Sequence, residues 1–301
     1  MAGIDINRTT TNVINDPEIS SEIWGKAIED SFFMQHARRI TIPGPGIKVQ
    51  TITGEPTANW VAETNAKPVS THTFGTKTIT PYKLAVIEPF SMEFMRDKPA
   101  LYDELVRRLP GALATKFDAT ILGTTAPGSG FDVLGSATKV SLIPGNNATV
   151  YDQFLAADAA IAAGGGSMNA IGLAPQGRAK VLAAVDGDKR PLFTAGTQTG
   201  SIDNILGATV DINKRLYVAG TAGSPGTPAI VGVAGDFEDA VYGMVSDISI
   251  EFSREATLTN GNATYSLWQN NMVACKVECE IAFAVKSASE FVLLTGDTPS
   301  A

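Results

Sequence analysis

The sequence predicts an α+β protein, because strand patterns and helix patterns alternate along a chain that is rich in turn residues. Apolar and polar residues alternate from Val273 to Val285, which is the pattern of an exceptionally long strand with one buried face. Apolar residues recur at four-residue spacing from Leu101 to Ile121, which is typical of an amphipathic helix. The 29 glycines, 16 prolines and 18% charged residues favour many loops over a helical bundle.

Length and charge narrow the classes of function. A chain of 301 residues forms one large domain or two ordinary ones. Its formal net charge of −8 argues against a dedicated nucleic-acid binder, which carries a basic surface. Apolar runs stay below the ~18 residues of a membrane span, and the N-terminus lacks the apolar core of a signal peptide. We therefore expect a protein that is cytosolic when it is synthesised.

The N-terminal region, residues 1–39, is expected to be an arm followed by a short helix. Residues 1–22 are polar and rich in Thr, Asn and Asp, which is typical of an extended segment. Residues 23–39 carry apolar side chains at helical spacing, and Ser20 or Ser21 is placed to cap that helix.

Residues 40–95 predict a long projecting hairpin. Strand-like runs at Ile47–Thr53 and Thr76–Ile87 flank a polar segment with few core residues. A connection of that length without its own core usually marks a functional loop or projection. Trp60 lies in this segment without a large apolar neighbour, so we interpret it as an interface anchor. The alternative, that Trp60 folds back onto its own hairpin, stays open.

A long helix is predicted next, over residues 98–122. Pro99 suits its first turn and Asp97 is placed to cap it. Pro110-Gly111 should kink or divide the helix, because proline removes one backbone hydrogen bond and clashes with the preceding turn.

Residues 150–230 predict a second unit. A helix begins near Val150 and ends at the glycine run 164–166. A short buried strand over Ala170–Ala174 and another helix over Pro175–Val185 follow. The chain then returns to the first unit for its long strands.

The cysteines and histidines do not predict a reactive or metal-binding site. Cys275 and Cys279 lie about 13 Å apart on one strand, too far for a disulfide, and on its apolar face they are expected to be small buried residues. His36 and His72, the two histidines of the chain, are interpreted as surface residues, because they lack the neighbours that a nucleophile or a zinc ion needs.

The acidic pairs and glycine runs do not predict chemistry either. Asp236/Asp239 and Glu278/Glu280 fall on a turn or on the polar face of a strand, so we interpret them as solvated charge. The glycine run at 164–166 follows a helix, whereas a phosphate cradle follows a strand. We therefore expect no catalytic residue, no cofactor, no metal and no enzymatic activity.

Phrases in four parts of the chain resemble HK97-type tailed-phage major capsid proteins. VAGDFEDAVYGMVSDISIEFSRE and NNMVACKVECEIAFAVKSASEFVLL are similar to the C-terminal signature of that family. ANWVAET and KLAVIEPFSMEFMRD resemble its extended loop and the return strand. In position, the helix predicted at 98–122 resembles the family's spine helix, and the resemblance covers residues 40–294.

The resemblance implies an HK97-like capsid fold. Its parts would be an N-terminal arm and short helix at 1–39, an extended loop (E-loop) hairpin at 40–95, a peripheral domain with a long spine helix and long strands at 96–149 and 231–301, and an axial domain at 150–230.

The resemblance also implies a function. The chain would be a major capsid protein that self-assembles into pentamers and hexamers of an icosahedral phage head enclosing double-stranded DNA. Trp60, Glu63, Lys67 and Lys77 are the expected assembly contacts of the extended loop. Lys67 and Lys77 are also candidate donors for the covalent links between subunits that some members form.

The expected partners are further copies of this chain, with portal, scaffolding and decoration proteins as additional candidates and no membrane. The expected location is the virion capsid, assembled in the host cytoplasm. A net charge of −8 suits a wall that encloses DNA without binding its sequence. Two alternatives stay open: an encapsulin-like protein nanocompartment shell and a non-capsid hydrolytic enzyme.

Overall fold

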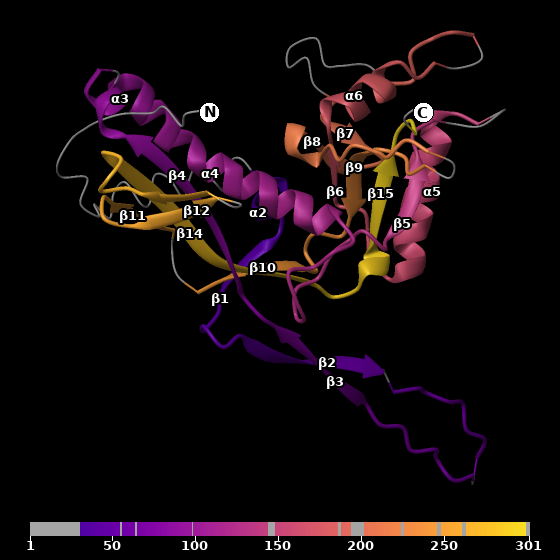
Figure 1. Ribbon diagram of the computed structural model, residues 1–301. Coiled ribbons are helices and arrows are strands. Elements are labelled where there is room, and N and C mark those ends of the chain that lie inside the picture. Colours follow the sequence, from indigo (N-terminus) through magenta and orange to yellow (C-terminus); the bar gives the residue numbers. More distant parts are fainter. Residues whose placement is uncertain are drawn as a thin grey trace.

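The computed structural model shows an α+β fold built on two sheets, with a hairpin that projects far from both (Figure 1). It describes residues 31–298, except for 55, 64, 98, 144–147, 186–187, 194–201, 224–225, 246–247 and 261–262. The helix start expected near residue 23 and its cap at Ser20 or Ser21 lie outside the described residues.

The first sheet is organised around one long strand, β14. Its members are β1 (Arg38–Thr41), β4 (Tyr82–Ser91), β10 (Ala240–Met244), β11 (Ser249–Ser253) and β14 (Met272–Val285). Strand β14 pairs antiparallel with β4 along one edge and with β11 and β10 along the other. The buried positions of β14 include Cys275, Val277, Cys279 and Ile281, which confirms the predicted strand and its core face.

Helix α4 (Pro99–Leu122) lies across this sheet, after the short helix α3 (Met92–Asp97), as Figure 1 shows. The helix continues through Pro110 without a break, so Pro110-Gly111 does not divide it, and the expected kink stays a prediction. A proline inside a helix costs ~3 kcal/mol, but each large apolar side chain buried on the sheet contributes ~1.5–3 kcal/mol. The buried side chains on α4 are Leu109, Leu113, Ala114, Phe117, Ile121 and Leu122.

The second sheet has six strands in the order β5-β15-β9-β6-β8-β7. Their bounds are β5 (Thr138–Ser141), β6 (Ala170–Leu173), β7 (Asn204–Ile205), β8 (Ala208–Ile212), β9 (Ile230–Gly235) and β15 (Phe291–Thr295). Helices α5 (Val150–Gly164) and α6 (Pro175–Leu182) pack against it, together with the short helix η1 (Lys214–Leu216). The short helix η2 (Ala288–Glu290) packs against α5. Gly165 ends α5 in the left-handed conformation, φ 93°, so the glycine run is a helix stop as predicted.

The first described helix, α2 (Phe32–His36), is shorter than expected at its C-terminal end. The sequence pattern extended this helix to residue 39, but Ala37 is already extended and β1 begins at Arg38. Strand β1 pairs parallel with β10. The backbone hydrogen bonds available at that sheet edge therefore override the helical spacing of the apolar residues.

A buried carboxyl fixes the start of α2. Asp118 on α4 accepts hydrogen bonds from Ser31 Oγ at 2.6 Å and from the Phe32 backbone N–H at 3.1 Å. Asp118 is fully buried, and burial raises its pKa to about 7, since these hydrogen bonds offset only part of the lost solvation.

This carboxyl makes a testable contribution to stability. Because its folded-state pKa lies above that of an unfolded aspartate, the native state binds more protons between roughly pH 4 and 7. The contribution is complete below that window and is lost as the pH rises through about 7. As the pH rises through this window, we expect the urea midpoint of unassembled wild-type subunits to fall. The urea midpoint of the Asp118→Asn variant should fall less steeply. Equal pH dependence in both proteins would show that this carboxyl does not titrate there.

The projecting hairpin consists of β2 (Ile47–Gly54) and β3 (Thr73–Ile79). The single strand expected over Thr76–Ile87 is two strands, because β3 ends at Ile79 and β4 begins at Tyr82. Pro81 between them has no N–H to donate, and the Thr80 N–H bonds to Gly130 O at 3.0 Å instead of to a strand. Strand β4 therefore lies in the first sheet and not in the projection. A second, shorter hairpin joins β12 (Thr257–Asn260) to β13 (Ala263–Ser266).

Candidate assembly surface

The outer part of the projecting hairpin exposes large apolar side chains. Trp60 is fully exposed, at 105% of its reference area, and Val69 and Phe74 are 91% and 70% exposed. Trp60 therefore does not fold back onto its own hairpin. Apolar groups gathered on a projecting segment are typical of a surface that another protein covers.

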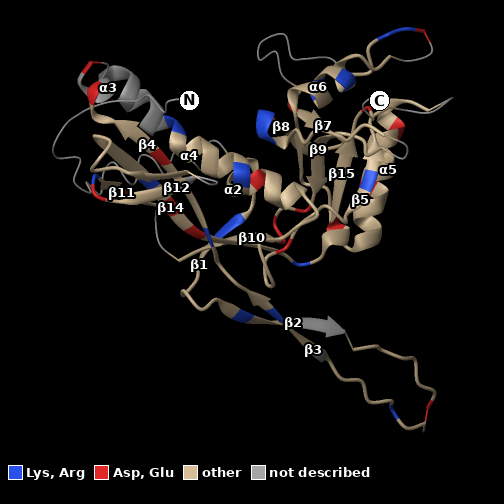
Figure 2. Ribbon diagram, viewed as in Figure 1, with Lys and Arg blue, Asp and Glu red and all other residues tan. Residues whose placement is uncertain are grey.

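The charged residues predicted with Trp60 are also exposed. Glu63 and Lys67 are both solvent-accessible, and Figure 2 shows acidic and basic residues at the far end of the projection. Thr57 N–H donates to Ser70 Oγ at 2.9 Å across the hairpin. The structure thus brings Trp60, Glu63 and Lys67 into one projecting segment.

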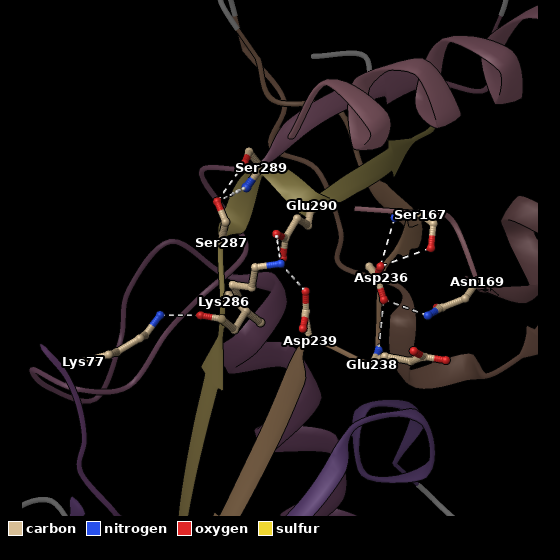
Figure 3. Close-up of polar contacts among 11 residues, drawn as sticks. Lys77, Ser167, Asn169, Asp236, Glu238, Asp239, Lys286, Ser287, Ser289 and Glu290 are labelled. Carbon is tan, nitrogen blue, oxygen red and sulfur yellow. Dashed lines mark hydrogen bonds and ion pairs between the residues drawn. The ribbon is translucent and has the colours of Figure 1, made fainter. Parts of the chain in front are cut away.

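Lys77 lies apart from these three residues, at the root of the hairpin. Its Nζ is 2.5 Å from Asp132 Oδ2 and donates to the backbone oxygen of Val285, as Figure 3 shows. The Lys77 side chain is only 31% exposed and that of Asp132 28%. Its ammonium group therefore binds within its own subunit.

A small apolar cluster supports the same root. It contains Ile42, Ile79, Ala282 and Ala284, with Ile47 packed against them. The root of the hairpin is thus attached to the first sheet through buried contacts, while Val49 and Phe74 further out are exposed.

The two sheets are joined by chain segments that carry a buried polar network (Figure 3). Asp236, after β9, accepts hydrogen bonds from Ser167 N–H at 2.9 Å and from Asn169 Nδ2 at 2.8 Å. Asp236 is only 9% exposed, so its interpretation as solvated charge is wrong. Its oxygens satisfy donors of the loop after α5, which encloses the carboxylate between the connecting segments.

A lysine completes the network on the connection from β14 to β15. Lys286 Nζ is 2.6 Å from Asp239 Oδ2 and 3.2 Å from Glu290 Oε1. Glu290 is 2% exposed, and its Oε2 has no hydrogen-bond partner among the described residues. One lysine thus neutralises a buried carboxylate between the sheets. Among the described residues, no cluster of three or more His, Cys, Asp or Glu side chains is arranged to hold a metal ion.

His36 is not the surface residue that the sequence indicated. Its Nε2 is 2.7 Å from Asp211 Oδ2 on β8, and its side chain is 19% exposed. The ring packs beside Phe32 and Phe237, because the last turn of α2 inserts between the two sheets. His72 is exposed on the hairpin as expected.

The two cysteines are free and buried, which confirms their interpretation as small apolar residues. Burial raises the pKa of both thiols to about 12, so neither is a reactive thiolate at neutral pH.

Exposed apolar residues also occur where the sequence interpretation did not place them. Val69 and Phe74 accompany Trp60 on the projection, and Trp268 is 74% exposed in the turn between β13 and β14. The signal that identified Trp60, a large apolar residue in a polar segment, also applies to these residues and could have found them.

The described helices include none that is both long and apolar enough to cross a membrane.

The chain has an HK97-like capsid fold. This fold combines a long helix on a β14-centred sheet, a second sheet joined through a polar connection, and a projecting hairpin. A sequence model of the phage capsid family matches residues 12–296, and the chain belongs to that family. It is therefore a structural protein of the virion capsid that associates with itself into a shell.

Similar proteins come from several phages. The chain is 33% identical over 295 residues to the probable major capsid protein gp17 of Mycobacterium phage L5, covering 93% of this chain and 88% of that protein. It is 29% identical over 293 residues to the protein of the same name from Mycobacterium phage D29, covering 93% and 89%. A solved structure from Gordonia phage Cozz superposes with a TM-score of 0.72 at 19% identity, covering 90% of this chain and 87% of that one.

Proposed function

We propose that this chain is the major capsid protein of a tailed phage and that it self-assembles into the pentamers and hexamers of an icosahedral head. The observation that carries the proposal is the family match along residues 12–296. The proteins named probable major capsid protein in phages L5 and D29 support it, because they are similar along nearly their whole length.

The projecting hairpin supplies the contact between subunits in this proposal. Ordering an isolated loop costs about 1–2 kcal/mol per residue in backbone entropy, and the outer hairpin buries little apolar surface of its own. Trp60, Val69 and Phe74 are exposed, so covering them on a neighbouring subunit would offset that cost. Glu63 and Lys67 would form the polar rim of the contact.

The enclosed cargo in this proposal is double-stranded DNA, held without sequence-specific contacts. A net charge of −8 supports a wall of low intrinsic affinity for DNA. Portal, scaffolding and decoration proteins would be further partners, and assembly would take place in the host cytoplasm. We also propose that the protein has no catalytic turnover, since Asp236 accepts from backbone and amide donors and both Asp239 and Glu290 pair with Lys286.

The division of the chain in this proposal follows the sequence pattern. Residues 1–39 would be the arm, 40–95 the extended loop with its return strand, and 150–230 the axial domain. The peripheral domain would combine 96–149 with 231–301, segments from which β5, β15 and most of β9 join the sheet of the axial domain.

Electron microscopy of the protein produced alone in a bacterial host tests the proposed function. We expect closed icosahedral particles with pentamers at the vertices, sedimenting far faster than a 31.5 kDa subunit. Soluble monomers under all conditions, including co-expression with neighbouring phage genes, would contradict a self-assembling shell. Particles that package a co-produced protein and exclude DNA would instead indicate a nanocompartment.

A further inference from the structure

The root of the hairpin is attached by a closed set of polar contacts. Asp132, in the loop after α4, accepts hydrogen bonds from Lys77 Nζ and, at 2.9 Å, from the Val285 backbone N–H. Lys77 Nζ also donates to the backbone oxygen of Val285. The Asp132 backbone is itself fixed, because its N–H donates to Phe283 O at 2.9 Å. Three chain segments, β3, the loop after α4 and the end of β14, therefore meet at one lysine.

Lys77 occupies the boundary between the buried root and the exposed projection. Two residues nearer the body, Ile79 is 4% exposed, whereas Phe74, further out on the same strand, is 70% exposed. The register partner of Lys77 on β2 is Val49, which is already 38% exposed. An isolated two-stranded hairpin is only marginally stable, so the direction of the projection depends on contacts at this boundary.

The ion pair between Lys77 and Asp132 is partly buried. Both charged side chains are about two-thirds buried, at 31% and 28% exposure. Hydrogen bonds between charged partners are about twice as strong as neutral ones, and partial burial reduces their screening by salt.

These contacts adjoin the polar connection between the two sheets. Val285 is the last residue of β14, and the next residue, Lys286, binds Asp239 and the buried Glu290. Figure 3 shows Lys77 on one side of this segment and the Asp236 contacts on the other. A displacement of β3 that pulls on Val285 therefore acts directly on the segment that joins the sheets.

We propose that Lys77 and Asp132 form a clamp that sets the direction in which the hairpin leaves the subunit, and that the clamp couples hairpin position to the 286–290 connection. The importance of this direction for assembly rests on the proposed function. The clamp assigns Lys77 a positioning role within its own subunit, in place of an inter-subunit link, and leaves Lys67, which is exposed, as the other candidate donor for such a link.

Hydrogen exchange measured by mass spectrometry on unassembled subunits tests the clamp. In Lys77→Met, we expect the amides of residues 47–50 and 76–79 to exchange about tenfold faster than in the wild type, because charged hydrogen bonds at the root are lost. Coupling predicts faster exchange at 286–290 as well. Lys77→Arg, which keeps the charge and the donors, should retain most of the protection. Lys67→Met, which removes the same charge from the outer hairpin, should leave both regions unchanged.

The outcomes separate the parts of the proposal. Wild-type exchange at the root in Lys77→Met would overturn the clamp, and acceleration at the root alone would overturn the coupling to 286–290. If Lys77→Met does not fold, Asp132→Asn provides the same test from the other partner. Because exchange is measured on free subunits, a failed clamp leaves the capsid proposal intact. A wild-type protein that forms no particles would overturn the capsid proposal without changing the exchange result.

Discussion

Subunits that lack the outer hairpin should fold normally and fail to form shells. The variant replaces residues 52–74 with Asn-Gly and so joins Thr51 to Gly75, which are directly paired in the β2–β3 ladder. Asn-Gly favours a tight two-residue turn, and the variant retains Lys77 and the buried Ile79 at the root. The two sheets and α4 lie elsewhere, so their packing is unaffected (Figure 1).

Circular dichroism and sedimentation measure the two parts of this expectation. We expect a wild-type spectrum and melting temperature but only subunits or small oligomers in the ultracentrifuge. A second variant keeps the full length of the hairpin and replaces Trp60, Val69 and Phe74 with serine, which tests whether the apolar surface rather than the length is required. Normal closed particles from the shortened chain would contradict the role of the hairpin as an assembly contact.

Val277→Asp should prevent the subunit from folding. Val277 is 1% exposed on β14, between Val86 on β4 and Ile250 on β11. A carboxylate at that position would be buried without a partner, at a cost of several kcal/mol. Because domains of this kind are stable by only about 5–15 kcal/mol, we expect insoluble or unfolded protein.

The matched control for Val277→Asp is Ile87→Asp on the neighbouring strand. Ile87 lies opposite Lys276, the residue before Val277, and is 49% exposed, so the same change places the new charge in water. Soluble yield and thermal melting of the two variants should differ clearly. A Val277→Asp protein that melts like the wild type would show that this face of β14 is not core.

The strands and helices with strong periodicity were predictable from the sequence, because one-sided burial imposes a period on the residues. This holds for β14 and for α5, whose glycine stop is visible in the chain. The continuity of α4 through Pro110 was not predictable from local propensity, since it depends on the packing of distant residues. The early end of α2 was missed for a similar reason. The residues after the helix pair as β1 with β10, which is distant in sequence.

The candidate site was predictable only in part. Trp60, Glu63 and Lys67 could be assigned to a projection because a long polar segment lacks a core of its own. The different role of Lys77 could not be recognised, because its partners Asp132 and Val285 are remote in sequence. The same holds for Asp236, whose burial depends on Ser167 and Asn169. Spacing along a chain does not reveal which charge meets which partner.

The central position of β14 also determines when a newly made subunit becomes complete. Strands β1 and β4 are synthesised early, but they pair with β10 and β14 from the last part of the chain. Contacts between such distant segments form slowly, because a long loop must close before they are made. The first sheet therefore stays open until β14 has left the ribosome. A nascent chain exposes its hairpin before the first sheet can form, so subunits competent for assembly arise only after β14 has been synthesised.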